Sequence, residues 1–260
     1  MRRRLLLGLA LATAALGPTA CSDDAAGDVT GGDTGEITVL AAASLTETFT
    51  ALAEQFETAH PGVTVRLAFD SSATLAGQAA EGAPADVLAT ADAATMQDAV
   101  DAGAVAGGEA GPTRFATNVM TLVVPADNPA GLTSFADLER PDVDYVVCVE
   151  TAPCGAVAAA LLAANEVDAD PASLETDVKA VLGKVVSDEA DAGLVYVTDA
   201  TAAGEAVRRI EVPDAESEVL DYPVAVLEQA REPGWAKEFI DLVLAAEGQA
   251  VLADAGFGAP

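Results

Sequence analysis

The stretch Ile37-Thr38-Val39-Leu40-Ala41-Ala42-Ala43-Ser44 decides the fold, because a short apolar run stops there at small and hydroxyl residues. The same pattern returns at Val63–Phe69 before Ser71-Ser72, and at Tyr145–Val149 before Pro153-Cys154-Gly155. Each instance predicts a strand that leads directly into a helix. A helix start has unpaired N–H groups and a partial positive charge, so three of them at strand ends predict a site for a small anion.

Strands and helices alternate through the first part of the chain. Leu45, Phe49, Leu52 and Phe56 recur at helical spacing before the turn His60-Pro61-Gly62. A strand at Asp86–Thr90 and a helix at Ala93–Asp101, capped by Asp92, continue the alternation. This rhythm predicts an α/β fold with mostly parallel sheets and a ligand site beyond the carboxyl ends of the strands.

A second α/β unit is predicted after the long apolar run Phe115–Val124. Its expected elements are a strand at Val143–Val149, helices at Ala156–Asn165 and Asp177–Val186, and a strand at Gly193–Val197. The run Asp221–Val226 predicts a strand that returns to the first unit. We therefore expect lobe I to comprise residues 36–117 and 221–260, lobe II to comprise residues 118–220, and the ligand cleft to lie between them.

The N-terminus predicts export and a lipid anchor. Three arginines precede the apolar stretch Leu5–Leu16, which is typical of a signal peptide, here assigned to residues 1–20. Thr19-Ala20-Cys21 resembles a bacterial lipobox, in which the cysteine is lipid-modified. Residues 21–35 are nearly all small or polar and predict a flexible tether. The expected location is extracytoplasmic, at the surface of the cell membrane.

The charge and the cysteine content limit the kinds of molecule that the chain is expected to bind. The formal net charge of −30, from 12 Lys and Arg against 42 Asp and Glu, disfavours nucleic acid and anionic lipid headgroups. A bound anion must then be held by local dipoles. Cys148 and Cys154 predict a disulfide in an extracytoplasmic compartment, and neither metal-cation ligands nor a cofactor are expected.

The predicted helix starts differ in how their backbone donors are used. Ser44 and Glu47 fit a capping box, which by itself explains Ser44 without any ligand. Ser72 has no acidic partner three residues later, so its hydroxyl stays available. If Ala152 caps the next helix, the Cys154 N–H is free, and Thr176 as a cap would likewise free the Val178 N–H.

Five segments resemble the molybdate-binding proteins of bacterial ABC transporters, and the resemblance covers residues 36 to 257. They are Ile37–Leu45, Phe69–Leu75, Gly82–Val87, Gly193–Tyr196 with Asp199-Ala200, and Tyr222–Val226. The resemblance implies a two-lobed periplasmic-binding-protein fold of type II. It also implies a monomer that binds molybdate, and tungstate as well, and delivers it to a membrane permease.

The resemblance also implies which residues hold the oxyanion. Ser44 and Ser72 match the two serines of the family, and Tyr196 matches its tyrosine. Cys154 and Val178 match the positions whose backbone N–H groups bind the ligand. No residue coordinates the metal directly, since the ligand is bound through its oxygens.

Other functions remain open on the sequence. Asp70 at the cleft would suit a protonated phosphate, although alternation along its strand predicts that Asp70 faces solvent. Sulfate is a further tetrahedral candidate. A serine hydrolase is disfavoured because the single histidine, His60, lies in a turn and no Gly-x-Ser-x-Gly motif surrounds Ser44 or Ser72. A structural lipoprotein would bind no anion at all.

Overall fold

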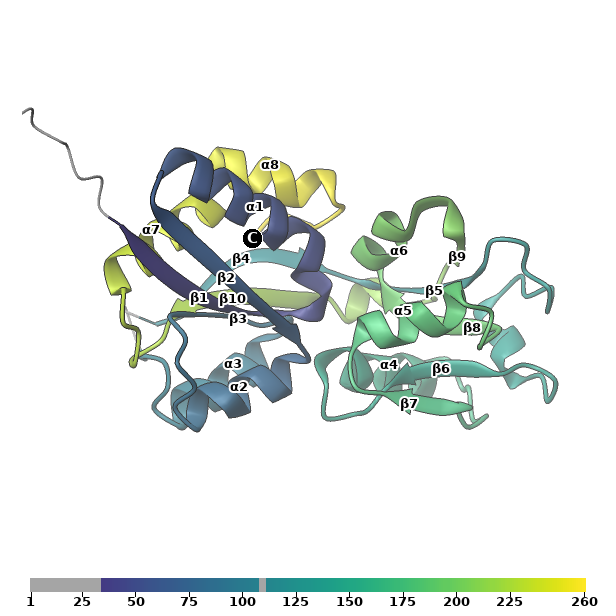
Figure 1. Ribbon diagram of the computed structural model, residues 1–260. Coiled ribbons are helices and arrows are strands. Elements are labelled where there is room, and N and C mark those ends of the chain that lie inside the picture. The colour runs from purple at the N-terminus through teal and green to yellow at the C-terminus, as the bar shows by residue number, and fades with distance from the viewer. Residues whose placement is uncertain (1–33, 108–110) are drawn as a thin grey trace, which may run out of the picture. The chain divides into compact units, whose positions relative to one another are not determined.

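Two five-stranded sheets organise the chain in this computed structural model, which describes residues 34–107 and 111–260 (Figure 1). The predicted signal peptide, Cys21 and all but the last two residues of the predicted tether lie outside the described residues. None of the helices in the described part is long and apolar enough to cross a membrane.

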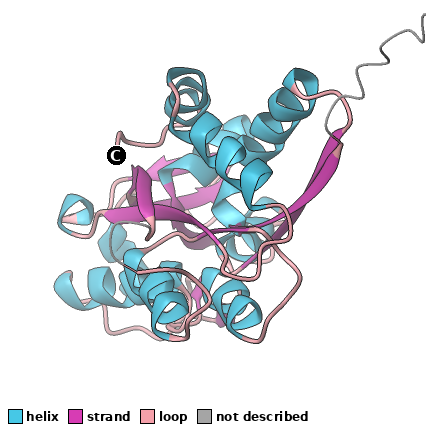
Figure 2. Ribbon diagram, turned by 90° about the vertical axis from the view of Figure 1, so that its left-hand side faces the viewer, coloured by secondary structure: helices cyan, strands magenta, loops and turns pink. Residues whose placement is uncertain are grey.

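The first sheet has the strand order β2-β1-β3-β10-β4. Its strands are β1 (Gly35–Ala42), β2 (Val63–Asp70), β3 (Val87–Ala89), β4 (Thr113–Asn118) and β10 (Leu220–Val226). Helices α1 (Thr46–Ala59), α7 (Pro233–Leu244) and α8 (Ala246–Asp254) cover one face, whereas α2 (Ser72–Ala80) and α3 (Ala93–Asp101) cover the other (Figures 1 and 2). The sheet is thus buried on both faces.

The second sheet has the order β7-β6-β8-β5-β9. Its strands are β5 (Met120–Pro125), β6 (Tyr145–Cys148), β7 (Ser173–Glu175), β8 (Ala192–Tyr196) and β9 (Val207–Ile210). The associated helices are α4 (Pro153–Ala164), α5 (Val178–Val186) and α6 (Val197–Ala203). Short 3-10 helices complete the described part at η1 (Ala43–Leu45), η3 (Phe135–Glu139), η4 (Gly204–Ala206) and η5 (Ala215–Ser217).

The α/β class and the two-sheet division are confirmed, and each sheet is mixed, with one strand that runs against the direction of the other four. β1 runs parallel to β2 and β3, whereas β10 runs antiparallel to β3 and β4. In the second sheet β6 pairs in parallel with β7 and β8, whereas β5 is antiparallel to β8 and β9. The antiparallel pairs arise because the chain crosses between the sheets twice and each crossing inserts a strand of reversed direction.

The two crossings lie at Val119 and before Leu220. The apolar run predicted over Phe115–Val124 is divided there, since β4 ends at Asn118 in one sheet and β5 begins at Met120 in the other. β10 returns to the first sheet at Leu220. We propose the lobe ranges 36–117 with 221–260, and 118–220, because both predicted boundaries lie within two residues of these crossings.

Aromatic side chains form the centre of the first lobe. The predicted apolar stripe of α1 is buried, and Phe49 packs its ring 5.7 Å from that of Phe115 and 5.9 Å from that of Phe239. Phe239 lies on α7, so the C-terminal part of the chain packs back on the first lobe, as the sequence predicts. This core fixes the start of α1 against the end of β1.

Candidate functional site

A small cavity lies where strands end and helices start. The five predicted ligand-binding residues all line it: Ser44, Ser72, Cys154, Val178 and Tyr196. The first two come from elements of the first sheet and the last three from elements of the second. The structure therefore brings together in one place every side chain and amide that the sequence assigned to the oxyanion.

Ser44 does not form the predicted capping box, and this interpretation is corrected. It lies within η1, and neither η1 nor α1 has a side-chain cap. Its Oγ instead lies 3.0 Å from the hydroxyl of Tyr222, which is fully buried. Glu47, the other member of the expected box, forms an ion pair elsewhere.

The hydrogen-bond network behind Ser44 leaves its proton free. Asn118 Nδ2 donates to Thr198 Oγ1 at 2.9 Å and to the Tyr222 hydroxyl at 3.4 Å. Tyr222 then satisfies its own buried proton by donating to Ser44 Oγ, because a buried unpaired donor is costly. Ser44 accepts this bond, so its single hydroxyl proton can be donated into the cavity.

The Ser72 hydroxyl also accepts a hydrogen bond from the protein and keeps its proton free. Ser72 is the first residue of α2, with Ser71 as the N-cap, and its Oγ accepts the backbone N–H of Ala91 at 2.9 Å. The acceptor side of the hydroxyl is therefore used within the protein. Its proton is available to a ligand, as is that of Ser44.

Two helix starts in the second lobe contribute backbone N–H groups. Ala152 caps α4 and Pro153 opens it, as predicted, so Cys154 takes the second position. The cap of α5 is Asp177 rather than the predicted Thr176, because its carboxylate accepts the N–H groups of Lys179 and Ala180. Val178 becomes the first helical residue. In the described part of the chain, neither the Cys154 N–H nor the Val178 N–H has a hydrogen-bond partner.

The start of α4 is held tightly against the end of β6. A disulfide joins Cys148 to Cys154, with their Cα atoms 5.8 Å apart. A Cβ added to Gly155 would lie 1.9 Å from the carbonyl oxygen of Val149, so only glycine fits there. Both features fix the position of the Cys154 amide.

The Tyr196 hydroxyl has no hydrogen-bond partner in the part of the chain that the structure describes. The residue as a whole is 1% exposed. Burial raises the pKa of Tyr196 well above its usual value, with smaller contributions from Tyr222 and Asp199. The hydroxyl therefore stays protonated, and an anion in the cavity would receive its hydrogen bond.

Asp70 also lines the cavity, contrary to the prediction that it faces solvent. It is partly buried, and its Oδ1 accepts the N–H of Ser71 at 2.7 Å. The alternation rule fails because Asp70 is the last residue of β2, where the chain turns into α2. Asp177 is the other carboxylate in the lining, and among the described residues no lysine or arginine lines the cavity.

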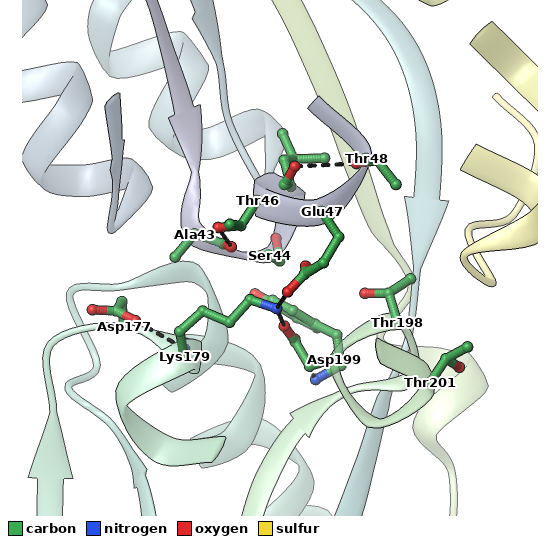
Figure 3. A network of polar contacts seen from close by, with 12 residues as sticks. Ala43, Ser44, Thr46, Glu47, Thr48, Asp177, Lys179, Thr198, Asp199 and Thr201 are labelled. Atoms are coloured by element: carbon green, nitrogen blue, oxygen red, sulfur yellow. Dashed lines mark hydrogen bonds and ion pairs between the residues drawn. The ribbon is translucent and has the colours of Figure 1, made fainter. Parts of the chain in front are cut away.

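Lys179 lies beside the site and links three elements (Figure 3). Its Nζ is 2.8 Å from both carboxylate oxygens of Glu47 and 3.0 Å from Oδ1 of Asp199. Burial raises the pKa of Asp199 to about 6, against the opposing attraction of Lys179. Burial alone would lower the pKa of Lys179, but Asp199 and Glu47 outweigh it, so the net direction is upward.

Other surfaces suit an anion less well. A wider groove of about 740 Å³ is lined by Glu211, Asp214 and Glu216 together with Arg209, and carboxylates are its main charged groups. In the described residues no group of three or more His, Cys, Asp or Glu side chains could hold a metal ion. Sequence reasoning missed Tyr222, Asn118 and Lys179. Tyr222 belongs to a segment of the family resemblance, and no local signal marked the other two.

Comparison with known proteins places this geometry in a family. A family model described as "Bacterial extracellular solute-binding protein" matches residues 37–258. The chain belongs to this family. Proteins of this family bind solutes outside the cytoplasm, and the family is one of transport proteins rather than enzymes.

One curated relative shares nearly the whole length. The molybdate-binding protein ModA of Mycobacterium tuberculosis H37Rv is 41% identical over 259 residues, which cover 98% of each chain. Two solved structures match with a TM-score of 0.73: the periplasmic molybdate-binding protein of Azotobacter vinelandii (19% identity, 86% of this chain and 99% of that one) and the sulfate-binding protein SubI of M. tuberculosis (22% identity, 86% of each). At these identities the two structures establish the fold alone.

The buried carboxylate of this solute-binding protein predicts a pH effect on stability. Because folding raises the pKa of Asp199 above the usual carboxyl value, its contribution is fully present below about pH 4 and is lost as the pH rises through about 6. Asp199→Asn removes this dependence. Thermal melts from pH 4 to pH 7 should show the variant gaining stability relative to the parent as the pH rises. Parallel melting curves for the two proteins would contradict the raised pKa.

Proposed function

We propose that this protein captures molybdate outside the cytoplasm and delivers it to the membrane permease of an ABC transporter. The observation that carries the proposal is the unpartnered, buried Tyr196 hydroxyl in a cavity that Ser44 and Ser72 also line. The 41% identity to a molybdate-binding protein over nearly the whole chain supports molybdate as the ligand.

The mechanism follows from the kind of donors in the cavity. Molybdate is a fully ionised dianion at neutral pH, so it accepts hydrogen bonds and offers no proton. Two serine hydroxyls, the Tyr196 hydroxyl and the amides of Cys154 and Val178 are all neutral donors with protons to spare. Hydrogen bonds to an ionised acceptor are roughly twice as strong as neutral ones, and helix starts add a favourable dipole. Because the donors come from both lobes, binding the ion favours lobe closure.

Phosphate is the second candidate, favoured by one observation. Asp70 lines the cavity, and a carboxylate there can accept the proton that phosphate keeps at neutral pH. The same carboxylate repels a fully ionised anion. Sulfate has the charge of molybdate but is a smaller tetrahedron, so it leaves some of the donors out of reach.

A hydrolase is less well supported by the site. The serines have no histidine near them among the residues that line the cavity. His60 packs instead against the rings of Phe56 and Trp235 on the first lobe. Among the residues that line the cavity, no histidine is therefore placed to act as the general base for Ser44 or Ser72.

Several further features belong to the same proposal. Tungstate has the shape and charge of molybdate and should bind as well. Lipidation of Cys21 would keep the protein at the membrane surface, where the permease is, and residues 22–35 would tether it there. The protein would act as a monomer, with no cofactor of its own.

The ligand can be tested by thermal shift across oxyanions. Molybdate should raise the melting temperature, because a ligand at about a thousand times its dissociation constant stabilises the folded state by roughly 4 kcal/mol. Sulfate and phosphate at the same concentration should have no effect. A response to phosphate that is lost in Asp70→Asn would assign the site to phosphate, and an equal response to sulfate would end the molybdate assignment.

Two matched variants distinguish ligand binding by the Tyr196 hydroxyl from the packing of the tyrosine ring. Tyr196→Phe removes only the unpartnered hydroxyl, so calorimetry should show molybdate affinity weakened by about 1.5–3 kcal/mol while the ligand-free protein keeps or gains stability. Tyr222→Phe also removes one buried hydroxyl, but that hydroxyl bonds Ser44 and Asn118. It should lower the stability of the ligand-free protein. Unchanged molybdate affinity in Tyr196→Phe would rule out this site.

A further inference from the structure

Lys179 is unusual among the charged residues near the site. It follows the proposed amide donor Val178, yet it is not part of the cavity lining. Its ammonium donates hydrogen bonds to both carboxylate oxygens of Glu47 and forms an ion pair with Asp199, 3.0 Å from Oδ1. Carboxylates, and not the cavity, therefore surround the charge of Lys179.

The partners of Lys179 come from different lobes. Glu47 lies in the first turn of α1, whereas Lys179 and Asp199 lie in the first turns of α5 and α6. Of the ion pairs between described residues, Lys179–Glu47 alone joins an element of the first sheet to one of the second. Figure 3 shows the ammonium between the two carboxylates.

A proposed donor lies at or just before the start of each of these three helices. Ser44 lies three residues before Glu47, Val178 directly precedes Lys179, and Tyr196 is the N-cap of α6. Asp199 also accepts the backbone N–H of Tyr196 through its Oδ2 at 3.3 Å. A single ammonium group thus connects the helix starts on which the ligand donors stand.

A role as counter-ion to Asp199 explains one of the two contacts of Lys179 but does not explain its bond to Glu47. The Asp199 side chain is fully buried and needs a counter-charge, which Lys179 supplies from within the same lobe. Glu47 has no such need, because its side chain is 52% exposed and is solvated without a partner. The bond from Lys179 to Glu47 is therefore the part that depends on the approach of the two lobes.

We propose that Lys179 is a positioning residue that holds α1 against α5 and α6 through Glu47, so that the donors of both lobes meet around one oxyanion. Asp199 keeps the ammonium pointed towards α1 in the open and closed forms, and Glu47 engages it on closure. This assignment rests on the proposed function, since it concerns the same ligand site.

Glu47→Gln tests the proposal with a closely matched control. Glu36 forms an ion pair of the same 2.8 Å length with Arg66, and its side chain is also 52% exposed, but both residues lie in the first lobe. Calorimetry should show molybdate binding weakened about 2- to 5-fold in Glu47→Gln and unchanged in Glu36→Gln. Both ligand-free variants should melt within a degree or two of each other. Equal molybdate affinities in the two variants would overturn the proposal.

A second measurement needs no ligand. Because the ion pair stabilises the closed form, it raises the fraction of ligand-free protein that is closed. Small-angle X-ray scattering of the ligand-free proteins should therefore give a larger radius of gyration for Glu47→Gln than for the parent or Glu36→Gln. Equal radii together with equal affinities leave Lys179 a counter-ion for Asp199 alone. If the parent fails to bind molybdate, the proposed function is wrong, and the scattering result by itself decides whether the ion pair holds the lobes together.

Discussion

A doubly charged anion that is held without a cation needs neutral donors whose protons are not already used, and this constraint governs the site. The chain carries a net charge of −30, and two carboxylates line the cavity, so attraction by the protein's overall field cannot hold the ligand. Each serine hydroxyl satisfies its acceptor side within the protein, through Tyr222 for Ser44 and Ala91 for Ser72. The hydroxyl proton of each serine is then available for donation to a ligand in the cavity.

The fold is what makes such donors converge. Helix starts supply free N–H groups, and both sheets place several helix starts at the ends of their strands around one cavity. Asn118 stands at the end of β4, where the chain leaves the first sheet, and it bonds both Tyr222 of the first lobe and Thr198 of the second. Asn118, at the crossing between the sheets, thereby holds the Tyr222 hydroxyl that bonds Ser44.

Local sequence patterns predicted the parts of this structure that depend on local geometry. The strand-to-helix junctions, the Ala152 cap of α4 and the apolar stripe of α1 all follow from residue spacing. The capping box at Ser44 was wrong because Tyr222, 178 positions away, bonds Ser44, and Lys179 takes Glu47. Long-range partners of this kind leave no local signal, and the antiparallel pairing of the sheets likewise depends on where the chain crosses between lobes.

The central claim is that one oxyanion lies among Ser44, Ser72 and Tyr196 and the amides of Cys154 and Val178. Diffraction from crystals grown with molybdate, recorded at the molybdenum absorption edge, locates the metal directly. The account predicts one anomalous peak per chain, inside the cavity and within hydrogen-bonding reach of these donors through the oxyanion's oxygens. An anomalous map with no peak in the cavity, or with its peak at another surface, would contradict it.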